Sequence, residues 1–326
     1  MIRCRLPSYE YKSIFSNELH SFLKFRKSLG YACRQEPYVF KTLDDHFCGM
    51  RLMEKEITYD LFESWIESLP IGPSTKSAYT SRYRTFALYL QKLGCIAYVP
   101  QGFTMKSHYV PQIFSDNELK RLFKACDNLK TRRSATNAHI SFPVVVRMLY
   151  GCGLRISEAL GLKIADVDLR NGILHVRNAK GNRDRLVPMS KSLTGICRQY
   201  FKAFHSDAAP EDYFFHSENG TCYLNCWASK WMYVVLEQAG LDRNVNPENG
   251  KGRALHALRH TFAVNSLRKM QTDDVDRYRA IPILSTYMGH DDIYGTELYL
   301  QMTADVHADM IQKVTAYSAS VFPEVE

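Results

Sequence analysis

The strongest constraint on the fold is a break in the hydrophobic pattern over residues 98–112, a stretch that contains two prolines and a glycine. Proline and glycine without helical or strand periodicity predict an extended connector. A chain of 326 residues is too long for one ordinary domain and about right for two. We therefore predict one domain over residues 1–97, a linker over 98–112, a second domain over 113–302 and a tail over 303–326.

The segment before the break has the periodicity of helices. Apolar residues recur at helical spacing over about residues 16–30, 38–52, 60–69 and 74–93. Ser16 is expected to cap the first helix, and Gly94 to end the fourth. In the third, Leu61, Trp65 and Leu69 fall on one face. Because no strand pattern accompanies these helices, a small helical bundle is predicted.

The segment after the break mixes helices with two strands. It opens with a capping box over Ser115–Glu118. Further helices are predicted over about residues 142–150, 191–204, 223–239 and 255–270. Residues 173–177 and 185–188 have strand character, and the turn-rich residues between them predict a hairpin. The predicted fold class is mainly α with a small antiparallel β-sheet, an α+β arrangement.

Composition narrows the classes of partner. The chain has 42 Lys and Arg against 34 Asp and Glu, a net charge of +8, which favours an anionic partner. No apolar run reaches the roughly 18 residues that would span a bilayer, and the first residues lack a signal peptide's apolar core. The nine cysteines are odd in number and scattered, which favours a reducing compartment. The one close pair, Cys222 and Cys226, lacks a histidine at ligand spacing, so no zinc site is expected.

The most informative motif is His256-Ala-Leu-Arg259-His260. On a helix these two imidazoles and the guanidinium share one face, while Leu255 and Leu258 lie on another and would anchor the helix to the core. Arginine can bind two phosphate oxygens at once, and histidine can move a proton near pH 7. The alternative is a solvated helix face without a ligand.

Two further basic residues have an ordinary explanation and a functional one. Arg155 follows two glycines near a predicted helix start, either as a surface arginine paired with Glu158 or as a second phosphate clamp. Lys180 lies at the hairpin tip among other cations, either on a solvated edge or on a finger that contacts a nucleic-acid backbone. The remaining candidate is a nucleophile, Tyr299, which lies nine residues after His290. Its competitors as a nucleophile are Tyr278, Tyr287 and Tyr294.

Taken together, the motifs resemble those of the tyrosine recombinases, the phage integrase family. The resemblance is carried by the boxes Gly153-Leu-Arg-Ile-Ser-Glu-Ala-Leu160, His256-Ala-Leu-Arg-His-Thr-Phe262, Met288-Gly-His290 and Thr296-Glu-Leu-Tyr299. It extends over about residues 115–302 and implies a catalytic domain there, with a helical core-binding domain before it. The chain departs from the family pattern in a charged stretch near residues 271–281 and in an extended loop over 130–139.

The resemblance implies a role for each site residue. Arg155 and Arg259 would bind the nonbridging oxygens of a DNA phosphodiester, and Lys180 would protonate the leaving 5′ oxygen. Tyr299 would form a 3′-phosphotyrosine bond that conserves energy for rejoining, so that no cofactor and no metal is required.

The remaining roles also follow from the family. His256 would assist proton transfer, and His290 would hydrogen-bond the phosphate. His260 and Glu158 would hold these catalytic groups in position without contacting the phosphate themselves.

The family also implies partners and a setting. These are double-stranded DNA with inverted-repeat core sites and a homotetramer that exchanges strands through a Holliday junction in the bacterial cytosol or nucleoid. An accessory protein is compatible with this assembly. The expected role is integration or excision of a mobile element. The alternatives are dimer resolution by the same chemistry, relaxation of the type IB topoisomerase kind, and a catalytically silent DNA-binding protein. A helix after residue 303 would pack on its own domain or dock on a neighbour.

Overall fold

The computed structural model describes residues 9–101, 112–130, 137–177, 184–205, 208–243, 252–273 and 277–289. The chain divides into two compact units, residues 1–108 and 109–326. Each unit has its own hydrophobic core. Lys180, His290, Tyr294, Tyr299 and the tail over 303–326 lie outside the described residues.

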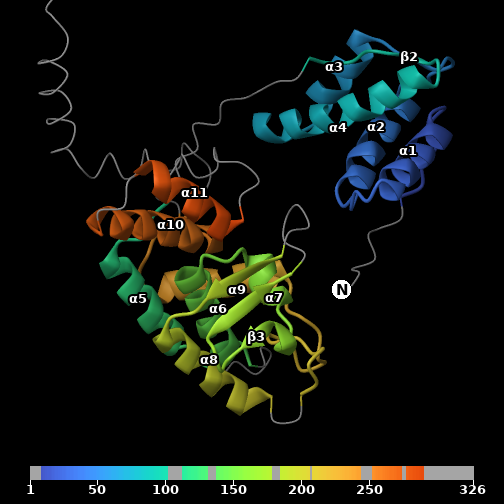
Figure 1. The fold of residues 1–326 in the computed structure, drawn as a ribbon. Helices are drawn as coiled ribbons and strands as arrows, with labels where there is room; N and C mark the ends of the chain where they lie inside the picture. Colours follow the sequence, from blue (N-terminus) through green and yellow to red (C-terminus); the bar gives the residue numbers. More distant parts are fainter. Residues whose placement is uncertain are drawn as a thin grey trace, which may run out of the picture. The chain divides into compact units, whose positions relative to one another are not determined.

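The first unit is built from the four predicted helices (Figure 1). They are α1 (Ser16–Ser28), α2 (Glu36–Gly49), α3 (Tyr59–Ser68) and α4 (Pro73–Lys92). The predicted cap is wrong, because Phe15 occupies the N-cap position of α1 and no side chain caps the helix. The predicted stop is confirmed at Gly94, whose φ of 82° lies in the left-handed region that glycine tolerates.

Aromatic side chains fill the centre of this unit. Trp65 of α3 is fully buried, and Phe22, Phe40 and Phe86 bring α1, α2 and α4 into contact at ring distances of 5.4–5.6 Å. Two short parallel strands, β1 (Glu56–Ile57) and β2 (Ile96–Ala97), were not predicted. At two residues each they are too short to leave a period in the sequence.

The second unit combines seven helices among its described residues with a three-stranded antiparallel sheet. The helices are α5 (Asp116–Asp127), α6 (Ala138–Cys152), α7 (Ile156–Gly161), α8 (Lys191–Phe204), α9 (Asn225–Gln238), α10 (Leu255–Thr272) and α11 (Arg277–Met288), with a 3-10 turn at Ile164–Asp166. The strands are β3 (Val167–Asp168), β4 (Ile173–Val176) and β5 (Arg185–Pro188). The mainly α fold with a small sheet is confirmed, as is the capping box at Ser115.

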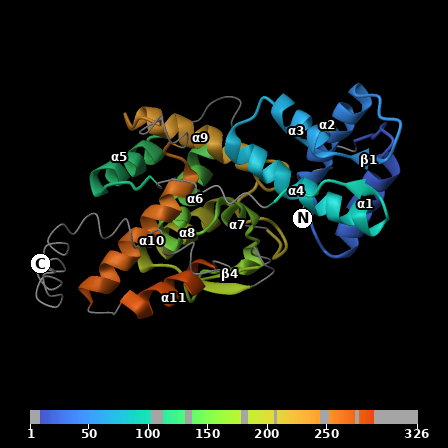
Figure 2. The same cartoon turned by 90° about the horizontal axis from the view of Figure 1, so that it is seen from above.

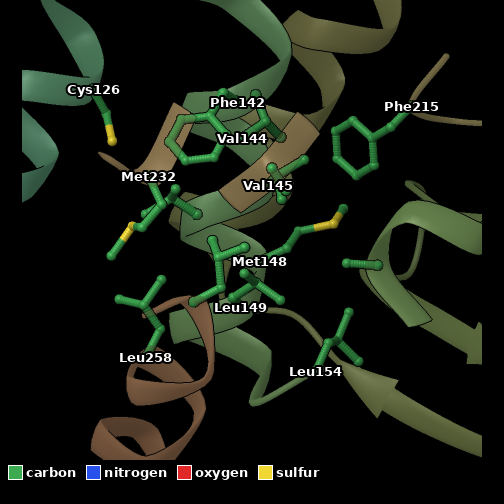
Figure 3. Packing of buried hydrophobic residues seen from close by; sticks show 14 of the residues in the cluster. Cys126, Phe142, Val144, Val145, Met148, Leu149, Leu154, Phe215, Met232 and Leu258 are labelled. Carbon is green, nitrogen blue, oxygen red and sulfur yellow. The ribbon is translucent and has the colours of Figure 1, made fainter. Parts of the chain in front are cut away.

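Helix α6 is the central element of this unit (Figure 2). Phe142, Val145, Met148 and Leu149 are buried along it, and Leu258 of α10 points toward the same cluster (Figure 3). The apolar face predicted for the 255–270 helix is therefore confirmed. Packing of α10 on α6 places the polar residues of α10 beside the end of α6.

Helix α11 was not predicted, and its first residues fall in the stretch near residues 271–281 that the sequence indicated only as charged and extra. It packs along α10 through a second cluster that includes Ala280, Leu284 and Met288 (Figures 1 and 2). These three residues recur every fourth position, which is helical spacing. Among the described residues, none of the helices is both long and apolar enough to cross a bilayer.

Candidate active site

Arg155 stands where α6 gives way to α7. Gly153 ends α6 with a φ of 61°, and Arg155 is the N-cap residue of α7, so its predicted place at a helix start is confirmed. A Cβ atom at position 153 would lie only 2.4 Å from Cδ1 of Phe262 on α10. Glycine is therefore required here for its backbone conformation and for the close approach of α10.

The Arg155 side chain is held by two acceptors. Its Nη1 donates to Oε1 of Glu158 at 2.8 Å, and its Nη2 donates to the carbonyl oxygen of Gly289 at 2.8 Å. About a fifth of the side chain is exposed. The pairing with Glu158 is thus present, and it orients a guanidinium that still reaches the surface.

Glu158 collects hydrogen bonds from two arginines. Its Oε1 and Oε2 accept from Nη1 and Nη2 of Arg185 at 3.1 and 2.8 Å, and Oε2 also accepts from the Arg155 backbone N–H at 2.8 Å. Burial would raise the pKa of this carboxyl, but the hydrogen bonds from Arg185 and Arg155 outweigh it and hold the pKa at about 2. Glu158 is therefore a buried anion across the neutral pH range.

Arg259 extends from α10 to the same place. Its Nη1 donates to the carbonyl oxygen of Gly153 at 2.6 Å, and its Nη2 to that of Met288 at 2.7 Å. Its Nη1 also lies 4.0 Å from Oε2 of Glu158. The side chain is 1% exposed, so the alternative of a solvated helix face does not describe Arg259.

The two histidines of α10 differ in exposure. His256 is exposed, whereas His260 is only 6% exposed. Their rings meet edge to face with centroids 4.4 Å apart, as expected for residues one helical turn apart. His256 is thus accessible to a ligand, and His260 lies behind it in the interior.

The described residues bring together Arg155, Glu158, His256, Arg259 and His260 in one unit. Lys180, His290 and Tyr299 remain predictions, because they lie outside the described part of the chain. Tyr287 is described, and it stacks on Phe262 with ring centroids 5.5 Å apart. Burial raises its pKa, which makes it a poorer nucleophile.

Arg185 is the residue of this cluster that the sequence reasoning did not single out. It lies on β5, and its Nε donates to the carbonyl oxygen of Tyr287 at 3.0 Å. The signal was present in the strand's two-residue period, which puts Arg185 on the same face as the buried Val187. A charged residue on the inward face of a strand requires a partner, and Glu158 provides it.

Comparisons with known proteins agree with this arrangement. The family described as "Phage integrase family" matches residues 112–305. The putative integrase/recombinase y4rB of Sinorhizobium fredii is 26% identical over 320 residues, which cover 93% of this chain and 97% of that protein. The tyrosine recombinase XerA of Pyrococcus horikoshii is 29% identical over 204 residues, 63% of this chain and 61% of that protein.

A solved structure shares the fold. It is the XerH site-specific recombinase bound to a palindromic difH substrate in a post-cleavage complex. The TM-score is 0.66 with 16% identity, over 95% of this chain and 91% of that one. The predicted family resemblance is confirmed.

Proposed function

Because the chain belongs to the phage integrase family and is a tyrosine recombinase, we propose that it cleaves and rejoins DNA at specific sites through a phosphotyrosine on Tyr299. The observation that carries this proposal is the meeting of Arg155 and Arg259 at the end of α11. Arg155 donates to the carbonyl of Gly289 and Arg259 to that of Met288, the two residues that immediately precede His290. These contacts between residues of three distant boxes support a single site.

The chemistry needs this concentration of positive charge. A phosphodiester is anionic and repels a second anion, and a tyrosine of ordinary pKa near 10 is ionised only about one time in a thousand at pH 7. Arg155 and Arg259 would neutralise the charge that builds on the phosphorane. His256 would assist proton transfer, His290 would hydrogen-bond the phosphate, and Lys180 would protonate the 5′ oxygen as the bond to it breaks.

The hydroxyl of Tyr299 would attack the phosphorus, and the new 3′-phosphotyrosine bond would replace the bond to the 5′ oxygen. Attack by that 5′ hydroxyl, or by one from a partner strand, would reverse the step and release the tyrosine. Cleavage and rejoining would need no external energy source, because the number of phosphoester bonds is unchanged.

The test is covalent capture of DNA. Purified protein is incubated with nicked fragments of the host genome in EDTA, denatured, and the DNA bound to protein is sequenced. We expect wild-type adducts at a defined sequence and none with Tyr299→Phe, which should still bind DNA. Tyr294→Phe is the matched control and should form the adduct. If Tyr299→Phe forms adducts while Tyr294→Phe does not, the nucleophile is wrongly assigned.

The wider assembly is also a proposal. A helical domain over residues 1–97 and a catalytic domain over 113–302 would close around double-stranded DNA, and four protomers would exchange strands in the bacterial cytosol through a Holliday junction. The chain's net charge of +8 favours such a polyanionic partner. The tail over 303–326 would dock on a neighbour and couple the four sites.

The proposed role is integration or excision of a mobile element, as the name of the relative y4rB supports. A second role by the same chemistry is dimer resolution. The observation that favours it is the similarity to XerA, a relative named as a tyrosine recombinase and not as an integrase. Sequenced adducts separate the two roles, since integration requires sites on an element and on its target, whereas dimer resolution requires one site repeated on the dimer.

A further inference from the structure

We infer that Arg185 is a positioning residue of the strand-transfer reaction, which fixes Arg155 against the end of α11 by holding Glu158 between them. The inference rests on the proposed function. Arg185 lies outside the family motifs that identified the site.

All three nitrogens of the Arg185 guanidinium have acceptors. Nη1 and Nη2 donate parallel hydrogen bonds to the two carboxylate oxygens of Glu158, at 3.1 and 2.8 Å. Nε donates to the carbonyl oxygen of Tyr287 at 3.0 Å. A planar fork that binds a carboxylate through two parallel bonds fixes orientation as well as distance. Arg185 therefore determines how Glu158 lies relative to α11.

Close packing reinforces the contact with α11. A Cβ atom added at Gly289 would lie 3.1 Å from Nη1 of Arg185, and the φ of Gly289 is 64°. The Arg185 side chain is only 12% exposed, and that of Glu158 only 6%. Little room remains for either group to adopt a second position.

Arg155 depends on both of the elements that Arg185 holds. Its Nη1 donates to the same Oε1 that accepts from Arg185, and its Nη2 donates to the carbonyl of Gly289. If Arg185 were shortened, Glu158 and the end of α11 would lose their common anchor, and the Arg155 guanidinium would lose its fixed direction. Lysine keeps the charge but presents a single ammonium, which cannot reach three acceptors in one plane.

The test compares three DNA substrates carrying the captured site. One has the natural phosphodiester at the cleavage position. The second has a methylphosphonate there, whose neutral phosphorus group reduces the need for cationic neutralisation. The third has sulfur in place of the bridging 5′ oxygen, which leaves as a thiolate and needs no proton donor. Single-turnover adduct formation is measured for each, together with DNA affinity and thermal unfolding.

Arg185→Lys should slow adduct formation on the phosphodiester by about 100-fold, the size expected for a misplaced catalytic group. On the methylphosphonate the loss should fall below about 10-fold, because a misplaced Arg155 then matters less. On the sulfur substrate the 100-fold loss should remain. DNA affinity should stay within about twofold of wild type, since phosphate contacts elsewhere supply most of it.

Arg198→Lys is the matched control. Arg198 also donates through Nε and Nη2, at 3.0 and 2.6 Å, but to the carbonyl of Leu169 on an exposed surface. It should behave as wild type on all three substrates. If Arg185→Lys does not fold, the same ratios are to be read from Arg185→Gln, whose amide can still donate to Glu158.

Three results would overturn the inference. An equal loss on all three substrates would show that Arg185 only supports folding, and recovery on the sulfur substrate alone would show that it acts through the hairpin and Lys180. Absence of any loss would also overturn it. In each case wild-type protein still forms the adduct, whereas failure of the proposed function would show as no wild-type adduct on any DNA.

Discussion

Replacing Glu158 by glutamine tests the electrostatic account of the site most directly. The substitution keeps the shape of the side chain and removes its charge from between Arg155 and Arg185. The carboxyl pKa lies at about 2 in the folded protein against an ordinary value of 4.5, a difference worth about 3 kcal/mol of stability at neutral pH. For a unit of about 200 residues this corresponds to a loss of about 6–12 °C in Tm.

The direction of the pKa shift determines how the stability contributed by Glu158 changes with pH. The folded pKa is depressed, so the stabilisation is complete above about pH 5 and is lost as the pH falls toward 2. The gap in unfolding free energy between wild type and Glu158→Gln should therefore shrink by about 2 kcal/mol between pH 7 and pH 3, because the carboxyl becomes protonated in the unfolded wild-type chain while it is still ionised in the folded one. Chemical denaturation at a series of pH values measures this gap.

The control is Glu211→Gln, which removes the charge of a carboxylate in an exposed pair with Lys163. Exposed pairs contribute little, so this variant should follow the wild-type curve at every pH. A gap for Glu158→Gln that stays constant from pH 7 to pH 3 would refute the reasoning. It would mean that the carboxyl titrates alike in the folded and unfolded chains.

Two further substitutions test the packing that supports the site. Gly153→Ala should cost about 2–4 kcal/mol, from left-handed strain and the clash with Phe262, whereas Gly161→Ala, with no neighbour within 4 Å, should cost nothing measurable in urea unfolding. A stable Gly153→Ala would contradict the close approach of α10. Thr261→Val should cost about 1–3 kcal/mol, because the Phe114 N–H, 3.0 Å from the Thr261 hydroxyl, would lose its acceptor. The exposed Thr85→Val is its control, and equal losses in the two would refute the assigned bond.

Periodicity predicted the helices of the first unit to within a few residues, but it missed α11. Its apolar residues Ala280, Leu284 and Met288 recur every fourth position, yet Pro282 and the surrounding charges mask the pattern. Packing against α10 supplies the stability that local propensity does not. Pro282 is exposed, and as the sixth residue of α11 it lacks the N–H that an interior helix position donates, which weakens the local helix signal.

The sequence predicted which residues belong to the site, but not how deeply they are buried or which partners hold them. The order of boxes indicated Arg155, His256 and Arg259 as members of one site, and the structure brings these three into one unit. The burial of Arg259 and the part played by Arg185 depend on residues 153–158 lying close to the end of α11, more than a hundred residues later in the chain. No local sequence pattern predicts this long-range contact. The position of Arg185 on the inward face of β5 indicated only that the arginine needs a buried partner.

The guanidiniums of Arg155, Arg185 and Arg259 lie close together around the carboxylate of Glu158. The ends of two helices explain how these three positive charges are tolerated side by side. The last carbonyls of an α-helix lack partners within the helix and carry partial negative charge. Here such carbonyls accept from the arginines, at Gly153 directly after α6, at Tyr287 and Met288 of α11, and at Gly289 directly after α11. Carbonyl dipoles orient Arg155, Arg185 and Arg259 without cancelling their charge, whereas further carboxylates would neutralise them. Counted over the described residues Arg155, Arg185, Arg259 and Glu158, the charge of this cluster is positive, which is what an anionic phosphorane requires.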